Sequence, residues 1–178
     1  MTILQHDLHG YRALGRLMSL MTVDEKHSPS AASTLDVLWV LYDRVLQIDP
    51  AAPEDPDRDR FLLSKGHGPM AYYAVLAAKG FFPTAELTSF GSAGSRFGNH
   101  PDAALLPGVE ISSGSLGHGL PIAVGLALGL RAGGTRPPRV FVLLGDGELD
   151  EGSNHEAIQV AGRLRLDGLT AVVIDNTS

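Results

Sequence analysis

The sequence predicts an α/β fold in which helices flank a parallel β-sheet. Residues 139–147, RVFVLLGDG, form an apolar run that ends in a Gly-Asp-Gly turn, and residues 170–175, TAVVID, form a second apolar run. Such runs are typical of buried parallel strands. The segment between them, residues 153–165, has a helical pattern, which completes a β-α-β unit. Ligands bind at the carboxyl ends of the strands in such sheets, so we expect a site there.

Helices are expected along the chain before this unit. Apolar residues at steps of three and four predict a helix over residues 4–22. A Ser-rich loop that contains His27 follows, and Ser33 or Thr34 is positioned to cap a second helix that runs to Leu46. Later we expect a proline-rich surface connection at residues 49–60, a short strand or turn at 61–64, a Gly-rich loop at 91–102, and helices at 69–80, 84–90 and 118–132.

The expected helix at residues 118–132 contains three glycines, Gly119, Gly125 and Gly129. Glycine inside a helix costs about 1 kcal/mol relative to alanine. We therefore expect a neighbouring backbone or a ligand to approach this helix closely.

Composition narrows the possible functions. With 178 residues the chain is expected to form a single domain, given about 150 residues for a typical domain. Its 14 basic and 20 acidic residues give a net charge of −6, and no basic cluster is present, so nucleic acid is not an expected partner. The longest apolar stretches are about half the 20 residues that a membrane span needs, so no membrane association is expected. The lack of cysteine excludes disulfides and thiolate chemistry and fits a cytoplasmic protein.

The ends of the two expected strands carry oxygen ligands. Asp146 lies between Gly145 and Gly147, and Asn176 follows the second strand. Carboxylate and amide oxygens are ligands that Mg²⁺ takes when phosphates complete its coordination, so a metal-bridged diphosphate site is indicated. The alternative is a tight turn at Asp146 and a simple cap at Asn176. Neither GxxxxGK[ST] nor a GxGxxG after a strand is present.

The motif GDGELDEGSNHEA, followed by the dipeptide DN, resembles the thiamine diphosphate signature of transketolases. The likeness extends upstream through SKGHG, GNHPD and GVEISSGSLGHGLPIAVGLALG, in the expected order and spacing. It covers nearly the whole chain from about residue 10. The chain is most similar to the N-terminal, diphosphate-binding (PP-type) subunit of transketolases that are encoded as two subunits.

This resemblance implies thiamine diphosphate and Mg²⁺, or Ca²⁺ or Mn²⁺, as cofactors. Asp146, Asn176 and the main-chain carbonyl of Ser178 would hold the metal, and the N–H of Gly147 would bind the diphosphate. His118 stands where many relatives carry Gln, so it either contacts thiamine or simply begins a helix. The full set of implied cofactor-binding residues is His67, Gly114, Ser115, Leu116, His118, Gly145, Asp146, Gly147, Glu148 and Asn176.

The resemblance also implies catalytic residues. His27 and His67 would contact the diphosphate and the sugar, and His100 a substrate hydroxyl. Imidazole suits this work because it titrates near neutrality and can donate or accept a proton. Glu151 and Glu156 would belong to an acidic relay between two active sites. The alternative for each of these histidines is a solvated or capping residue, and for each glutamate an ordinary residue on a helix surface. His6, His9 and His155 are expected to be ordinary helix residues.

The family's catalytic glutamate lies in a pyrimidine-binding domain that these 178 residues do not contain. The chain alone is therefore expected to be inactive and to need a C-terminal transketolase subunit, in a heterotetramer with two copies of each. Since the family's domain continues past the metal ligands, we expect residues 1–178 to be incomplete at their C-terminal end; the alternative is a shortened version of the domain. The loop HSPSAAS replaces a glycine-bearing HPGG-type loop, which bears on substrate specificity.

The resemblance implies transfer of a two-carbon ketol unit from a ketose to an aldose, with phosphorylated sugars as substrates. One alternative is a biosynthetic pair that delivers the unit to a carrier protein or an unusual sugar. Another is a non-catalytic scaffold subunit that keeps the fold.

Overall fold

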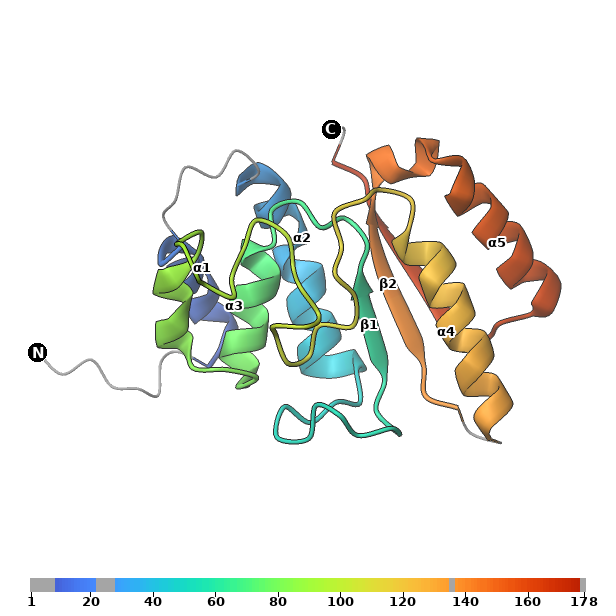
Figure 1. Cartoon of the computed structure of the whole chain (residues 1–178), viewed down its shortest axis with the longest axis horizontal. Helices are drawn as coiled ribbons and strands as arrows, with labels where there is room; N and C mark the ends of the chain where they lie inside the picture. Colours follow the sequence, from blue (N-terminus) through green and yellow to red (C-terminus); the bar gives the residue numbers. More distant parts are fainter. Residues whose placement is uncertain (1–8, 22–27, 135–136, 177–178) are drawn as a thin grey trace, which may run out of the picture.

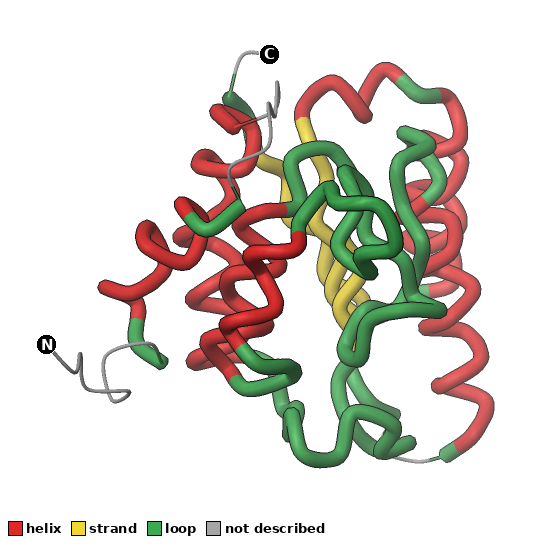
Figure 2. The backbone as a smooth tube through the Cα atoms, turned by 60° about the vertical axis from the view of Figure 1, so that its left-hand side comes forward, coloured by secondary structure: helices red, strands yellow, loops and turns green. Residues whose placement is uncertain are grey.

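The structure is a computed structural model that describes residues 9–21, 28–134 and 137–176. Its centre is a parallel sheet with strand order β1-β2-β3. β1 spans Arg60–Leu63, β2 Val140–Gly145 and β3 Leu169–Ile174. The helices form two groups, one on each side of the sheet (Figures 1 and 2). The predicted α/β fold class is confirmed.

The two helix groups pack on opposite faces of the sheet. One group contains α1 (Leu14–Ser19), α2 (Ser28–Val40) and α3 (Met70–Lys79), and the other contains α4 (Gly119–Gly133) and α5 (Gly152–Leu164). Successive side chains of a strand point to opposite faces, and β2 follows this rule. Its Phe141 and Leu143 join the α1–α3 core, whereas Val140, Val142 and Leu144 join the α4 core.

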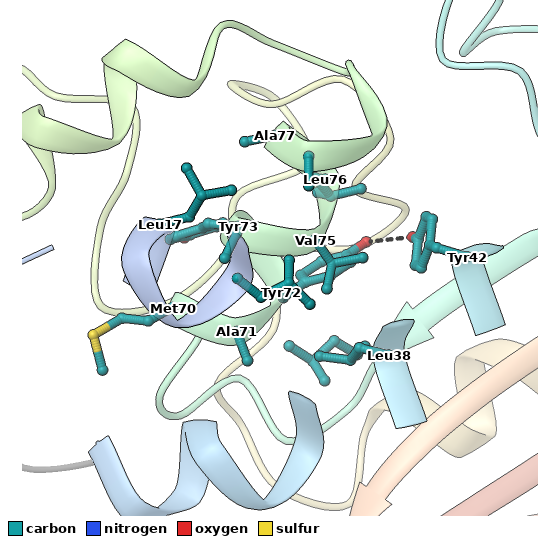
Figure 3. Packing of buried hydrophobic residues seen from close by; sticks show 14 of the residues in the cluster. Leu17, Leu38, Tyr42, Met70, Ala71, Tyr72, Tyr73, Val75, Leu76 and Ala77 are labelled. Carbon is teal, nitrogen blue, oxygen red and sulfur yellow. Dashed lines mark hydrogen bonds between the residues drawn. The ribbon is translucent and has the colours of Figure 1, made fainter. Parts of the chain in front are cut away.

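The core beneath α3 is rich in aromatic residues (Figure 3). The hydroxyl groups of Tyr42 and Tyr72 lie 3.2 Å apart and share a hydrogen bond. Tyr72 also bonds to the carbonyl of Gly108, and Tyr73 donates to the carbonyl of Gly98, both at 3.0 Å. These tyrosines tie α3 to the long loop that leads to α4.

The prediction that residues 170–175 form a buried strand is wrong in one respect. The strand exists as β3, but it lies at the edge of the described sheet, and Thr170, Ala171 and Val173 are exposed. α5 packs mainly on α4 rather than on this strand. An apolar run identifies a strand but does not say which neighbours cover it.

The first two helices differ from the predicted ranges. Within residues 9–21 a 3₁₀ turn at Tyr11–Ala13 leads into the short α1, and residues 4–8 and 22 lie outside the described ranges. The described part of α2 starts at Ser28, before the predicted caps, and proline is tolerated in the first turn of a helix because it sacrifices no needed N–H. Thr34 lies inside α2, and its hydroxyl donates to the carbonyl of Ala31 at 2.8 Å. A π-helical turn, Leu41–Val45, ends this helix near the predicted residue.

The remaining helices agree closely with the predictions. Residues 69–80 contain α3, residues 84–90 form a 3₁₀ helix at Thr84–Ser89, and α4 and α5 begin and end within about one residue of the predicted limits. In the described part of the chain, no helix combines the length and the apolar character needed to cross a bilayer.

Among the three glycines of α4, the backbone of the described chain closely approaches only Gly119. A Cβ on Gly119 would lie 2.7 Å from the Cα of Ser64. At Gly125 and Gly129 a Cβ would meet no other atom within 4 Å, since these positions face outward. No neighbouring backbone of the described chain therefore approaches those two glycines.

Candidate functional site

The carboxyl ends of the strands gather at one edge of the sheet, at the top in Figure 1. Leu63 of β1 pairs with Leu143 of β2, and Gly145 of β2 pairs with Ile174 of β3. The chain leaves these ends as the segments 64–68, 146–150 and 175–176. Polar residues on the three segments therefore share one edge, as predicted.

Asp146 and Asn176 occupy two adjacent strand ends. Asp146 begins a 3₁₀ helix, Asp146–Asp150, directly after β2, and Asn176 lies two residues after β3. Both are half-buried, and the amide of Asn176 donates to the hydroxyl of Ser33 on α2 at 3.1 Å. A carboxylate and an amide oxygen form a donor set that fits Mg²⁺ with a diphosphate. The third predicted ligand, Ser178, lies outside the described residues.

A site of this kind does not depend on a cluster of acidic or imidazole side chains. Among residues 9–21, 28–134 and 137–176, no group of three His, Asp or Glu residues is placed to hold a metal ion. One carboxylate, one amide and main-chain or phosphate oxygens would make up the donors instead.

His67 and His100 come together from distant parts of the chain. Their rings meet edge to face with centroids 5.2 Å apart. Gly114 lies beside them, and a Cβ there would be 2.7 Å from Cδ2 of His100. Gly114 also has a φ of +143°, which disfavours other residues. The motifs SKGHG, GNHPD and GSLGHG thus converge, as their assignment to one site predicted.

Lys65 is a residue of this edge that the sequence reasoning missed. It is only 6% exposed, and a Cβ on Gly145 would lie 3.6 Å from its Cδ. Burial lowers the pKa of Lys65, although the charges of Asp146 and Glu148 act in the opposite direction. A cation therefore lies beside the predicted metal ligand. Its position inside the motif SKGHG was the signal in the sequence that could have identified Lys65 as a site residue.

Glu148, predicted to bind the cofactor, is 1% exposed. Its carboxylate accepts hydrogen bonds from the hydroxyl of Ser64 and from the N–H groups of Gly117 and Gly145. This side chain is therefore directed into the protein.

The loop before α4 contains Gly117 and leads to the predicted residue His118. Gly117 has a φ of +81°, and a Cβ there would lie 2.6 Å from Cβ of Glu151. Ser153 donates to the carbonyl of Gly117 at 2.7 Å. His118 directly precedes α4 and is exposed, with Nδ1 3.1 Å from the carbonyl of Leu116. His118 thus occupies the N-cap position of α4.

The other predicted residues lie in more open surroundings. Ser115 and Gly147 are exposed, and Leu116 is half-buried. Glu151 and Glu156 are exposed at the start of α5, and Glu156 lines a shallow groove of about 260 Å³ between α4 and α5. His27 lies outside the described residues. His155 is a helix residue, as predicted, and its Nε2 lies 2.7 Å from the carbonyl of Leu149.

Comparison with known proteins identifies the family. Residues 11–178 match the thiamine diphosphate-binding domain of transketolases. The chain therefore belongs to the transketolase family, and the resemblance seen in its motifs is confirmed.

Solved structures give the same result for the fold. The transketolase of Leishmania mexicana has a TM-score of 0.75 at 30% identity, over 94% of this chain and 27% of that one. The transketolase of Campylobacter jejuni has a TM-score of 0.77 at 27% identity, over 97% of this chain and 28% of that one.

Three curated relatives are similar in sequence. The protein named ferredoxin fas2 of Rhodococcoides fascians is 60% identical over 93% of this chain and 55% of its own length. An apulose-4-phosphate transketolase subunit from Actinobacillus succinogenes is 42% identical, over 82% and 52%. The 6-deoxy-6-sulfo-D-fructose transketolase subunit SqwG of a Clostridium species is 40% identical, over 94% and 60%. The chain thus spans a little over half the length of these relatives.

Proposed function

We propose that this chain is the diphosphate-binding subunit of a two-component transketolase, which transfers a two-carbon ketol unit from a ketose to an aldose. One observation carries the proposal: His67, His100 and Gly114 meet at the edge of the sheet where Asp146 follows β2. Family membership supports thiamine diphosphate as the cofactor.

The proposed metal is Mg²⁺, with Ca²⁺ or Mn²⁺ as oxygen-binding substitutes. Asp146 and Asn176 would hold it together with the carbonyl of Ser178. The N–H of Gly147 would bind the diphosphate, and the open space around this glycine supports that role. Lys65 would add positive charge on the same side. When bound, thiamine diphosphate supplies the carbanion chemistry, and the protein binds and orients the reactants.

The two histidines supply proton transfer. A neutral imidazole has one donor and one acceptor nitrogen, so His67 and His100 could hold a ketose hydroxyl and take or return its proton. Their contact supports a joint role, because each ring restricts the orientation of the other. We assign His27 to the same group from its motif.

The proposed partner is a C-terminal transketolase subunit that carries the pyrimidine-binding domain and its glutamate. Relatives that are named as single subunits of a transketolase support a divided enzyme. We propose an assembly with two copies of each chain. The exposed positions of Glu151, which directly precedes α5, and of Glu156 on α5 are compatible with a relay to a second active site.

An unusual acceptor or donor is the second candidate. Two relatives are named for apulose 4-phosphate and 6-deoxy-6-sulfo-D-fructose, and both match most of this chain. Other relatives of similar identity are named simply as transketolases, so these names make a specialised sugar a second candidate beside a general activity. Delivery to a carrier protein has no comparable support among these names.

Reconstitution with the partner subunit tests the proposal. The pair, supplied with thiamine diphosphate and Mg²⁺, should transfer a ketol unit from a ketose phosphate to an aldose, while either chain by itself should be inactive. A panel that includes apulose 4-phosphate and pentose phosphates separates the two substrate classes. A pair that binds no thiamine diphosphate would instead be a scaffold.

A further inference from the structure

Glu148 is a buried carboxylate that joins three separate segments of the chain. Its Oε1 accepts the hydroxyl of Ser64 at 2.6 Å and the N–H of Gly117 at 3.1 Å. Its Oε2 accepts the N–H of Gly145 at 3.0 Å. The three donors come from the end of β1, the loop before α4 and the end of β2.

The hydrogen bonds continue beyond the carboxylate. The hydroxyl of Ser64 accepts the N–H of Gly119, the first residue of α4, at 3.2 Å. This N–H has no partner within its own helix. The side chain of Asn154 on α5 donates to the main-chain carbonyl of Glu148 at 2.6 Å. Both α4 and α5 are thus linked by hydrogen bonds to Glu148, α4 through Ser64 and α5 through Asn154.

Each of the three joined segments carries residues assigned above to the cofactor. Ser64 precedes His67 in SKGHG, Gly117 follows Gly114 and Leu116, and Gly145 precedes Asp146. We propose that Glu148 is a positioning residue. Its carboxylate holds the three segments in place, so that their cofactor-binding residues face the same site, and it does not itself touch the cofactor. This inference rests on the proposed function, and it replaces the expectation that Glu148 contacts the cofactor directly.

Only a carboxylate satisfies this arrangement. Both of its oxygens accept hydrogen bonds, and the three surrounding groups all donate. Glutamine has the same shape but only one acceptor oxygen, so its NH₂ group must face a donor on one side. The ammonium of Lys65 provides charge compensation, because the charges of the two groups interact.

The test compares Glu148→Gln with Asp150→Asn, an exposed carboxylate of the same 3₁₀ helix. Amide hydrogen exchange is measured on the full chain without cofactor. In Glu148→Gln, exchange should be at least about tenfold faster at whichever of Gly117 and Gly145 faces the NH₂ group, as expected for the loss of a buried hydrogen bond to a charged group. Amides of Val142 and Leu143 in β2 should keep their protection, and Asp150→Asn should match the wild type.

A second measurement uses the chain assembled with its partner subunit. The Kd for thiamine diphosphate with Mg²⁺ should rise at least about tenfold in Glu148→Gln, because binding must also order the loosened segments. At saturating cofactor, kcat should stay within about threefold of the wild type, since a positioning residue makes no contact with the reacting atoms.

Three results would overturn the inference. The first is unchanged exchange at both glycines together with an unchanged Kd. The second is a uniform loss of protection that includes β2, which would indicate a role in overall stability. The third is a large fall in kcat at saturating cofactor. If the wild-type pair does not bind thiamine diphosphate, the proposed function fails, and the exchange experiment still decides the role of Glu148.

Discussion

Gly66 lies directly against the main chain of Gly114. A Cβ on Gly66 would be 2.6 Å from the nitrogen of Gly114 and 2.7 Å from the carbonyl carbon of Ser113. Because both atoms belong to the backbone, no side-chain rotation can relieve the overlap. This contact holds the loop with His67 against the loop that packs on His100.

We therefore expect Gly66→Ala to force the two loops apart. Overpacking of this kind costs about 1–3 kcal/mol in the free energy of unfolding. The matched control is Gly129→Ala on the outer face of α4, where a Cβ meets nothing within 4 Å. That substitution should raise stability by about 0.5–1 kcal/mol. Urea unfolding of both variants checks the pair, and a stable Gly66→Ala protein would refute the close contact.

Arg165 caps α5 in the left-handed conformation, with a φ of 50°. Among the described residues it is the only one other than glycine with a positive φ. Because this conformation costs a side-chain-bearing residue about 1 kcal/mol, Arg165→Gly should raise the melting temperature. Arg163→Gly, inside the same helix, should lower it. A lower melting temperature for Arg165→Gly would mean that the arginine makes a stabilising contact.

Buried tyrosines predict a loss of stability in alkali. Burial raises the pKa of Tyr73, and likewise of Tyr42 and Tyr72. Above about pH 10 the unfolded chain releases these protons while the folded chain keeps them, so stability falls as the pH rises. Each such tyrosine contributes about 1.4 kcal/mol per pH unit.

Tyr73→Phe isolates one of these contributions. Unfolding free energies measured between pH 9 and 11 should fall less steeply than in the wild type, by about 0.7 kcal/mol per pH unit on average and approaching about 1.4 kcal/mol per pH unit at the upper end. The lowered pKa of the buried Lys65 makes stability rise with pH, but it does so equally in the wild type and in Tyr73→Phe. At neutral pH the variant should lose about 1 kcal/mol, because its bond to Gly98 is absent. Parallel pH profiles would contradict the assignment.

His67→Ala tests the proposed proton transfer. Turnover of the assembled enzyme should fall at least tenfold, since positioned acid-base groups typically contribute about 10²–10⁴. The chain should still fold, because the ring lies among loops at the sheet edge rather than in either core cluster. His155→Ala, on exposed α5, is the control. Unchanged turnover in His67→Ala would make His67 a structural residue.

Local patterns predicted the strands and the shared edge of Asp146 and Asn176. Apolar runs identified β2 and β3, and the rule for parallel sheets placed Asp146 and Asn176 at one edge. The approach of His67 to His100 followed only from the family resemblance, because no local pattern relates two loops this far apart in the chain.

Tertiary packing decided what local patterns could not. The burial of Glu148 depends on donors from Ser64 and Gly117, which lie far away in sequence. Nothing in GDGELDEG alone distinguishes a carboxylate that faces a ligand from one that faces the core. The exposure of β3 likewise depends on which elements pack beside it.

A calorimetric titration of the assembled pair with thiamine diphosphate tests the central claim most directly. Wild-type protein should bind the cofactor in the presence of Mg²⁺ and should lose most of its affinity for the cofactor when a chelator removes the metal. Asp146→Ala should lose it even with Mg²⁺, while Asp150→Ala should bind normally. Equal binding by Asp146→Ala and the wild type, or binding that ignores the metal, would contradict the assignment of this sheet edge as the metal and diphosphate site.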